Sequence, residues 1–517
     1  MEGVGNEYST YKNAELPLWR IIALTFGMIG NQLIWALQNG NASSYFLSLG
    51  LPDYLVGFAW LPGPLGGIIV QPIIGSISDR HTGKWGKRRP FLILTVIIVI
   101  LFGIVYSNAE LIAKYNDYSE KSKRVSLCVA ILSLWVLDWA INGTQTVLRA
   151  LYVDIAPPSQ QTVGMAWFSW MNSLGNIIGF GLGGCDYTQL GFVSNVQALY
   201  LIGSVVLFFT ILVTMITSKE VPLKKGEIHV TKQTCFEKTG LTHLVKLLKT
   251  LPNFPKEIRL VWFTQNIAFF AWYFIMLYGT VWMAVSIYGG DPDAPDGSVD
   301  KDNYDEGVRI GNLALMMQAI GSMIYSWLLP FILKFTGPRV AYGFAQVIQA
   351  VFMILVYWAT ESWQAITILV VLSIPWSTAW TVPWALASTA LTHSPDKALF
   401  LAAFFLAQVF PEIATVVIAN VVLYFNDNVS LVIALGGVVA LFSIFFVPFF
   451  PIKKIYAMVD EPGSSNINAD AADINGESTK AKPTSDIEGN PENTEDVVKV
   501  DLPITKEDII TTVKTHS

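Results

Sequence analysis

Charged residues are scarce in this sequence. Only 14% of the 517 residues are charged and 53% are hydrophobic, whereas soluble proteins average about 25% and about 45–50%. The acidic residues are also unevenly placed, because residues 460–517 hold 13 of the 39 acids but only 5 of the 33 bases. Residues 1–459 are therefore nearly neutral, which makes nucleic acid a poor candidate partner. The scarcity of charged residues in this part is that of a membrane protein rather than of a soluble one.

Cysteine is rarer still. Cys128, Cys185 and Cys235 have no paired spacing, so neither a disulfide framework nor a metal site is expected. The sequence also lacks a nucleophile and base set, a metal-ligand spacing and a phosphate-binding loop, so we expect no enzyme and no cofactor. The first apolar run is too long for the core of a signal peptide and contains no cleavage site, which predicts a retained membrane helix.

Long hydrophobic runs, by contrast, are abundant. A membrane-spanning helix needs about 20 mostly apolar residues. The runs that satisfy this are 21–47, 54–76, 91–108, 125–147, 163–185, 196–217, 260–285, 309–333, 340–360, 364–388, 399–425 and 429–449. The sequence therefore predicts an all-α membrane protein of twelve transmembrane helices.

A charged connection, 218–258, divides these runs into two six-helix halves, 21–217 and 259–450. Such a layout is typical of secondary transporters, whose substrate site lies near the bilayer midplane between the halves. The acidic tail, 451–517, is rich in Asp, Glu, Ser, Thr, Asn and Pro, and we expect it to be disordered. Residues 1–20, before the first span, form the N-terminal segment.

The distribution of lysine and arginine predicts the orientation. If the N-terminus is inside, inner segments before the tail hold 22 of these residues and outer loops hold 6, in line with the preference of cytoplasmic loops for positive charge. Both termini are therefore expected in the cytoplasm. The outer loop 290–306 is acidic, which indicates solvation, because it lacks the ligand spacing and turn glycine of a calcium site.

Polar residues inside the spans are costly, at about 2.5–3.5 kcal/mol for a central charged residue. The fourth span carries the densest set, Asp138, Asn142, Gln145 and Arg149, whose spacings of 4, 3 and 4 place them on one helix face. Hydrogen bonding between helices explains Asn142 and Gln145 as well as substrate binding does. A buried carboxylate can load and release protons in the physiological pH range, so we expect Asp138 to couple protons. Arg149 is expected to hold a substrate hydroxyl or a gating acid.

Three other spans contain candidate site residues. Glu412 follows Pro411, which kinks the helix, and a carboxylate there suits proton coupling, although a bond to a neighbouring hydroxyl is the alternative. The first span holds five amides, including Gln38 and Asn39, which suit a polyhydroxylated neutral ligand. Trp380 is the middle one of three tryptophans spaced four apart, and it serves either sugar stacking or packing at the membrane interface.

The loop after the second span, QPIIGSISDRHTGKWGKRRPF, contains a recognisable set: Gly75, Asp79, Arg80, Gly86, Arg88 and Arg89. It resembles the glycine, acid and basic loop of the major facilitator superfamily, in the lengthened form of plant sucrose carriers and their animal and fungal relatives. The resemblance continues through WALQNGNASSYFLSLGLP, LDWAINGTQTVLRA, FSWMNSLGNIIG and YDEGVRIG, and it covers most of 30–180 and patches of 260–415.

This resemblance implies symport of sucrose, or of a related α-glucoside such as maltose, with a proton as the coupling ion. It implies that Asp138 is the proton site, that Arg149 assists sugar binding, and that the Asp79 and Arg80 loop locks the two halves during alternating access. Asn172 and Asn176, in FSWMNSLGNIIG, join the candidate substrate-binding residues. The expected partners are a small neutral sugar and membrane lipid, and the expected location is the plasma membrane, with the vacuolar membrane as the alternative.

Three departures from the plant carriers stand out. Asp53 replaces their histidine, Gly279 and Val281 stand where they have two aspartates, and Glu412 stands where they usually have glutamine. The last two together suggest that Glu412 supplies the second acid from the C-terminal half. A proton-independent sugar facilitator and a non-transporting sugar sensor are the alternatives. The sequence names neither the sugar nor the oligomeric state.

Overall fold

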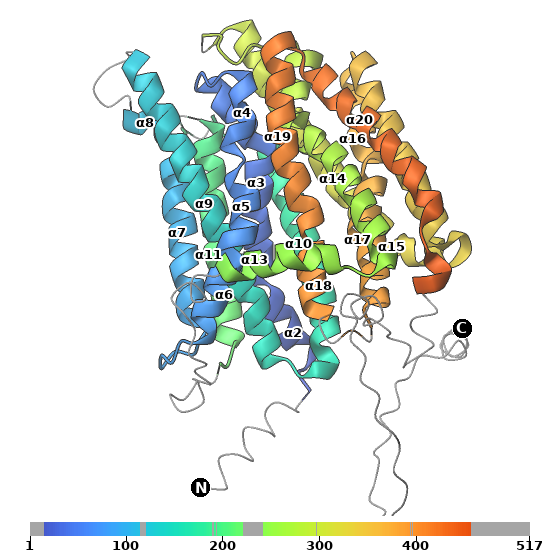
Figure 1. Cartoon of the computed structure of the whole chain (residues 1–517). Helices are drawn as coiled ribbons and strands as arrows, with labels where there is room; N and C mark the ends of the chain where they lie inside the picture. Colours follow the sequence, from blue (N-terminus) through green and yellow to red (C-terminus); the bar gives the residue numbers. More distant parts are fainter. Residues whose placement is uncertain are drawn as a thin grey trace, which may run out of the picture. The chain divides into compact units, whose positions relative to one another are not determined.

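The computed structural model describes residues 15–113, 120–188, 191–192, 194–220, 241–295, 297–392, 394 and 397–455. All regular structure in these residues is helical (Figure 1). The described residues belong to one compact unit, which comprises Met1–Pro462. The predicted tail, apart from its first few residues, and 221–240 of the central connection lie outside them.

The N-terminal half is built from eleven helical elements within the described residues. They are α2 (Leu18–Thr25), α3 (Gly27–Ser48), α4 (Asp53–Ala59), α5 (Pro62–Leu65), η1 (Gly66–Val70), α6 (Gln71–Asp79), α7 (Arg89–Ser107), α8 (Ala109–Ala113), α9 (Glu120–Ile155), α10 (Pro158–Gly183) and α11 (Asn195–Thr217).

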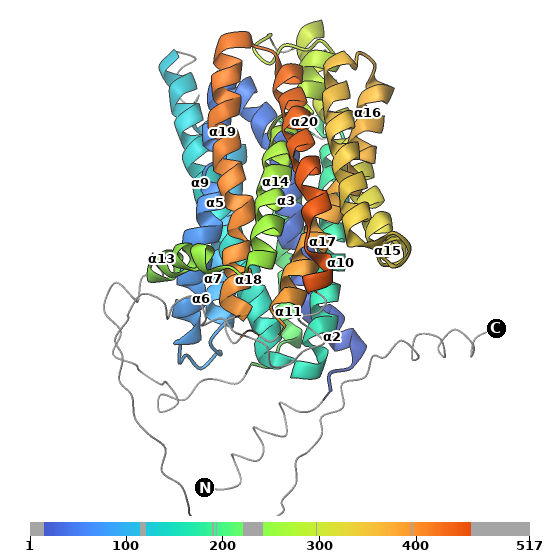
Figure 2. The ribbon, with the colours of Figure 1, turned by 45° about the vertical axis from the view of Figure 1, so that its right-hand side comes forward.

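The rest of the described chain comprises the end of the central connection and the C-terminal half. Its elements are α13 (Leu241–Thr250), η4 (Leu251–Asn253), α14 (Lys256–Trp282), η5 (Met283–Ile287), α15 (Val299–Leu355), η6 (Val356–Trp358), α16 (Ser362–Val371), α17 (Ser373–Ala390), α18 (Lys397–Phe404), α19 (Leu406–Asn426), α20 (Val429–Phe446) and η7 (Val447–Phe449). Figures 1 and 2 show α13 lying crosswise to the bundle.

Ten of the described helical segments are long and apolar enough to cross a membrane. One of them, Val299–Trp358, makes two passes, because α15 bends at Gly337, which has a φ of 75° and precedes Pro338. Counting both arms gives eleven passes. α10, with 26 residues, is not among the ten apolar segments, and it corresponds to the remaining predicted pass. The prediction of an all-α membrane protein is therefore confirmed for the part of the chain described.

One predicted boundary is wrong. The acidic segment 290–306 was expected to be a loop, yet α15 begins at Val299 and includes its second half. The Ser298 side chain accepts a hydrogen bond from the Lys301 backbone N–H, and Asp300 and Asp302 lie in the first turn. A capping hydroxyl and acidic residues both stabilise a helix N-terminus, so these acids begin a helix.

The second span is broken into short pieces. Pro62 and Pro64 lie in α5, and Pro72 lies at the start of α6. Proline removes a backbone donor and clashes with the preceding turn, and a π-helix, η1, follows α5 directly. These breaks lie at the level where α5 packs against α9 and α19.

Glycines allow the helices of the N-terminal half to approach closely. A methyl group on Gly175 would lie 2.6 Å from the Ile29 carbonyl oxygen, and one on Gly179 would lie 2.8 Å from the Leu33 carbonyl oxygen. Backbone contact of this kind drives helix association in membranes, where the hydrophobic effect between helices is absent. It fixes α3, which carries Gln38 and Asn39, against α10.

We define the lower end of the bundle as the end where α2 begins and α20 ends, and the upper end as the opposite one (Figure 1). At the upper end, hydrogen bonds and an ion pair join the two halves. They connect Gly40 with Asn312, Ser43 with Leu277, Ser44 with Tyr304, and Asp186 with Arg309. The structure therefore represents a state that is closed at the upper end.

Candidate functional site

Asp138 lies near the middle of α9 and is completely buried. Its Oδ1 accepts a hydrogen bond of 2.6 Å from Gln38 Nε2 on α3. Within the described residues no donor reaches its other oxygen, Oδ2. An unsatisfied buried acceptor costs about 1–3 kcal/mol, so this oxygen is placed for a partner that the helices do not supply.

Glu412, on α19 of the other half, faces the same point. A methyl group placed on Gly63 of α5 would lie 3.3 Å from Glu412 Oε1 and 3.9 Å from Asp138 Oδ2. The Tyr273 hydroxyl of α14 is the hydrogen-bonding neighbour of Glu412. The structure thus brings the two predicted proton-coupling residues together at the junction of the halves, although they are far apart in the sequence.

The polar face of α9 continues below Asp138. Asn142 donates to the Asp138 backbone carbonyl and accepts from Gln71 Nε2 at 2.8 Å. Gln145 is half-buried, and the Arg149 side chain is not fully covered by its neighbours, although it lies within a membrane helix. Arginine within a span is expected to face the bundle interior or a water-filled cavity. The role of Arg149 in holding a substrate hydroxyl or a gating acid stays a prediction.

The other predicted sugar-binding residues are spread over three helices. Asn176 of α10 accepts a hydrogen bond of 3.0 Å from Gln32 Nε2 of α3. The side-chain oxygens of Asn39 and Asn172 are buried and find no donor among the described residues. The oxygens of Asn39 and Asn172 can therefore accept a hydrogen bond from a ligand, whereas the oxygen of Asn176 already accepts one from Gln32.

Trp380 belongs to an aromatic cluster between α14 and α17. Its ring contacts Phe269 and Trp376 edge to face, at centroid distances of 5.5 and 5.6 Å, and Trp376 stacks on Trp272 at 4.8 Å. Trp380 is 41% exposed. An accessible indole ring can stack on the apolar face of a sugar ring.

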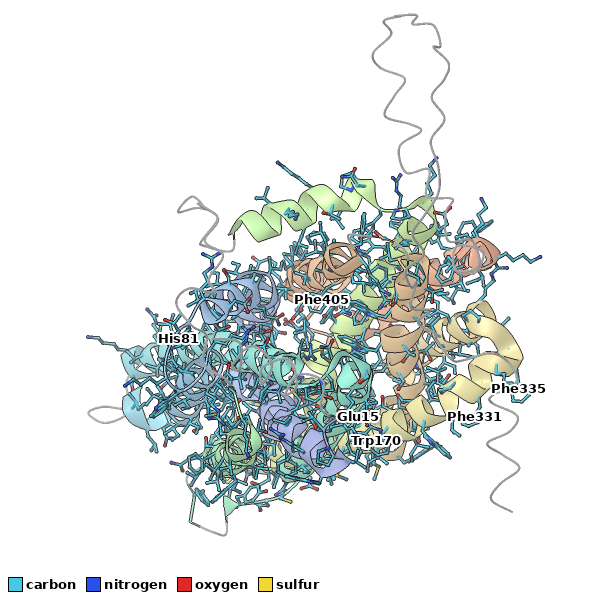
Figure 3. The ribbon with its side chains drawn as sticks, turned by 90° about the horizontal axis from the view of Figure 1, so that it is seen from below. Glu15, His81, Trp170, Phe331, Phe335 and Phe405 are labelled. Atoms are coloured by element: carbon cyan, nitrogen blue, oxygen red, sulfur yellow. The ribbon has the colours of Figure 1, made fainter. Side chains whose placement is uncertain are left out.

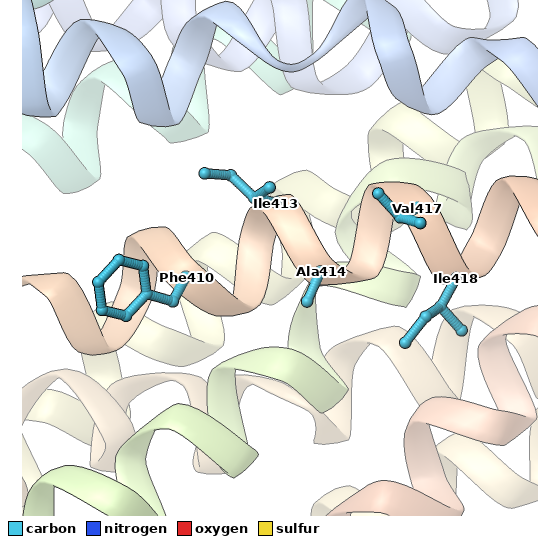
Figure 4. A pocket seen from close by; sticks show the side chains of 5 residues that line it. All are labelled: Phe410, Ile413, Ala414, Val417 and Ile418. Carbon is cyan, nitrogen blue, oxygen red and sulfur yellow. The ribbon is translucent and has the colours of Figure 1, made fainter.

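The pocket on α19 is a different feature. It has a volume of about 380 Å³ and is lined by apolar residues alone, namely Phe410, Ile413, Ala414, Val417 and Ile418 (Figure 4). At 100° per residue these side chains lie on the face of α19 opposite Glu412. An apolar wall cannot satisfy the hydroxyls of a sugar, so the polar site is on the other face.

Comparison with known proteins identifies the fold family. Residues 24–409 match the model of the Major Facilitator Superfamily. The chain belongs to this superfamily. It is a family of transporters rather than enzymes, as expected from the sequence.

Among curated members of the superfamily, the chain is 30% identical over 348 residues to sucrose transport protein SUT1 of Oryza sativa, and the match covers 64% of each chain. It is 27% identical over 434 residues to sucrose transport protein SUC4 of Arabidopsis thaliana, which covers 78% of this chain and 83% of that one. The similarity to plant sucrose carriers stated from the motifs is thereby confirmed.

Two solved superfamily structures show the same fold. The D-xylose-proton symporter aligns with a TM-score of 0.57 at 12% identity, covering 84% of this chain and 98% of that chain. The nucleoside transporter NupG aligns with a TM-score of 0.53 at 14% identity, covering 86% and 99%. The major facilitator fold predicted from the sequence is confirmed.

The superfamily loop lies at the lower end. Arg88 is buried and binds Asp79 and Asp154, the latter at 2.8 Å. Gly86 adopts a φ of 94°, which favours glycine. The Glu220 carboxylate accepts the Lys87 and Arg88 backbone N–H groups at 2.8 and 2.7 Å. The loop is therefore tied to the ends of α6, α9 and α11.

The other predicted residues of this loop also contact the N-terminal half. The Gly75 carbonyl accepts from Arg88, and Arg89 donates to Ser218 and to the Met215 carbonyl. Arg80, at the end of α6, has an interaction partner of its own. Among the described residues, the side chains of Arg88 and Arg89 bond only to the N-terminal half and to Ser218 directly after it. A lock between the halves stays a prediction.

Sequence reasoning missed three residues of the site. Gly63, Gln71 and Tyr273 contact or face the predicted residues. Gln71 is the first residue of the loop motif, but no polar stripe marks any of the three as part of the site. The pair of prolines around Gly63 is the one signal that pointed to this segment, because broken helices are frequent at transporter sites.

Proposed function

We propose that this protein transports sucrose, or a related α-glucoside such as maltose, across a membrane by alternating access, together with a proton. The main observation behind this proposal is that the carboxylates of Asp138 and Glu412 lie close together between the two halves and that Asp138 Oδ2 has no donor among the described residues. The similarity to plant proteins named sucrose transport proteins supports a sugar substrate.

The polar residues around the acids suit a neutral, hydroxyl-rich ligand. Gln38, Asn39 and Asn172 offer amides, and each has a buried side-chain oxygen without a donor among the described residues. Amides both donate and accept, as hydroxyl groups require. In this proposal these amides, with Asn142, Gln145, Asn176 and Arg149, bind the hydroxyls, and Trp380 stacks on the ring.

The proposed orientation follows from charge. The lower end, which carries the loop of Arg88 and Arg89, is cytoplasmic, because lysine and arginine collect on that side. The upper end is then outside, and the structure is closed to the outside. We place the protein in the plasma membrane, with both termini in the cytoplasm.

Transport by purified protein in lipid vesicles tests the proposal. Asp138→Asn should abolish sugar-driven proton uptake, because an amide cannot load a proton, while sugar exchange across the membrane continues. Glu412→Gln should reduce the same proton uptake at least tenfold. If Asp138→Asn drives protons as well as the wild-type protein does, the proton-coupling role is refuted.

One observation favours a second function, a proton-independent facilitator. Gln38 donates to Asp138 at 2.6 Å, and such a bond is also what a purely structural carboxylate would make. Gln38→Leu separates the two. A structural Asp138 carboxylate would lose the one donor that it has among the described residues, and the protein would be destabilised. A coupling Asp138 would mainly change the pH dependence of transport.

A further inference from the structure

Gly63 has an unusual environment. A methyl group at this position would meet two atoms within 4 Å outside its own helix and chain neighbours, namely Glu412 Oε1 and Asp138 Oδ2. The two carboxylates come from different halves of the protein, on α9 and α19. The space that a side chain at position 63 would occupy therefore lies at the point that both acids face.

A second observation indicates that a ligand belongs there. Asp138 is 0% exposed, and its Oδ2 has no hydrogen-bond donor among the described residues, although Oδ1 is bonded to Gln38. Water bound inside proteins occupies polar sites that offer two to four hydrogen-bond partners. Two carboxylate oxygens around one side-chain-free position meet that requirement.

We propose that the face of Gly63 binds one hydroxyl group, from water or from the transported sugar, which bridges Asp138 and Glu412 and passes a proton between them. This rests on the proposed proton coupling. The protonated carboxyl of Asp138 gives its proton to the hydroxyl oxygen, and that oxygen's own hydrogen moves to Glu412. One O–H bond breaks on Asp138, one forms on Glu412, and the hydroxyl group is regenerated.

Among the described residues, the other titratable groups that interact with the pair are phenols. Tyr106 on α7 and Tyr200 on α11 lie on the Asp138 side, and Tyr273 on α14 lies beside Glu412. A phenol ordinarily titrates near pH 10, so these side chains do not compete for the proton at neutral pH. The two carboxyl groups are the ones that exchange it.

The same span supplies a matched control. A methyl group on Gly67 would lie 3.5 Å from the Phe405 ring, which is ordinary contact, and would meet neither carboxylate. Phe405, in the link between α18 and α19, lies between the two halves in the view from below (Figure 3). Gly67→Ala therefore adds the same volume to the same segment without reaching the proposed hydroxyl site.

The test compares Gly63→Ala, Gly63→Ser and Gly67→Ala in vesicles, with sugar-driven proton uptake as the readout. Gly63→Ala should lower proton uptake at least tenfold, and Gly67→Ala should leave it within twofold of wild type. Serine is as bulky as alanine but carries a hydroxyl, so Gly63→Ser should recover most of the uptake. Proton uptake by Gly63→Ala equal to that of Gly67→Ala overturns the proposal, as does a Gly63→Ser protein no better than Gly63→Ala.

Sugar binding by the same variants identifies the source of the hydroxyl. If the sugar supplies it, Gly63→Ala weakens sucrose binding at least tenfold; if water supplies it, sucrose binding is unchanged. Asp138→Asn keeps this test separate from the proposed function. Proton uptake that survives Asp138→Asn refutes coupling altogether, whereas uptake that is lost in Asp138→Asn but kept in Gly63→Ala refutes the bridging hydroxyl alone.

Discussion

The ion pair between Asp186 and Arg309 joins the two halves at the upper end, so its removal should open that end. The Asp186 Oδ2 and Arg309 Nη1 atoms are 3.0 Å apart, and the side chains are 33% and 25% exposed. Exposed pairs contribute about 0.2–1 kcal/mol, and this partly buried one belongs near the upper value. Asp186→Asn should therefore shift the balance between the closed and open upper end about fivefold, since 1.4 kcal/mol is tenfold.

Disulfide crosslinking across the upper end measures this shift. The Ser44 and Thr280 hydroxyl oxygens, one on each half, are 3.4 Å apart, so cysteine sulfurs at these two positions would lie close together. In a background without Cys128, Cys185 and Cys235, the Ser44→Cys and Thr280→Cys pair should crosslink readily. Adding Asp186→Asn should reduce the crosslinking rate about fivefold.

Glu306 provides the control for this experiment. It also binds Arg309, but both residues lie on α15, three positions apart. Glu306→Gln therefore removes an acidic partner of Arg309 without removing a link between the halves, and it should change the crosslinking rate less than Asp186→Asn does. A rate that Asp186→Asn leaves unchanged would refute the reasoning.

Three further predictions concern pH and stability. The Thr188 backbone N–H and hydroxyl, and then Arg309, hold the pKa of Asp186 below its usual value. The contribution of Asp186 to closure of the upper end is therefore present above about pH 4 and is lost only at more acidic pH. The distance between spin labels on the two halves at the upper end should differ between wild type and Asp186→Asn by the same amount at pH 7 and at pH 5. Glu220→Ala should destabilise the superfamily loop by about 2 kcal/mol, because the backbone N–H groups of Lys87, Arg88 and Arg89 lose their acceptor. The melting temperature should fall, and an unchanged melting temperature would contradict this. Gly179→Ala should cost about 1–3 kcal/mol by the same assay, and Gly279→Ala, whose nearest contact is 3.5 Å away, should cost less.

The fold was largely predictable because hydrophobic runs of spanning length depend on local sequence alone. The stripe on α9 was predictable for the same reason, since one helix fixes the relative directions of Asp138, Asn142 and Gln145. The failure at 290–306 was also local. Acidic residues indicated a solvated loop, but their position after Ser298 makes them the first turn of a helix.

Contacts between helices could not be predicted from periodicity. Gln38 and Asp138 are 100 positions apart, and no pattern within either helix indicates which one it faces. The role of Gly63 is harder still to predict, because it depends on the absence of a side chain in glycine and on two acids that come from different halves. The suggestion that Glu412 takes the second acidic role gains support from this geometry, and its function remains a prediction.

Simultaneous measurement of sucrose uptake and of external pH, with the wild-type protein in vesicles, distinguishes proton symport from facilitated transport. Sucrose added outside should raise the external pH as the sugar enters, and the two signals should keep a fixed ratio. Sucrose uptake without any change in external pH would contradict proton symport and would identify the protein as a facilitator.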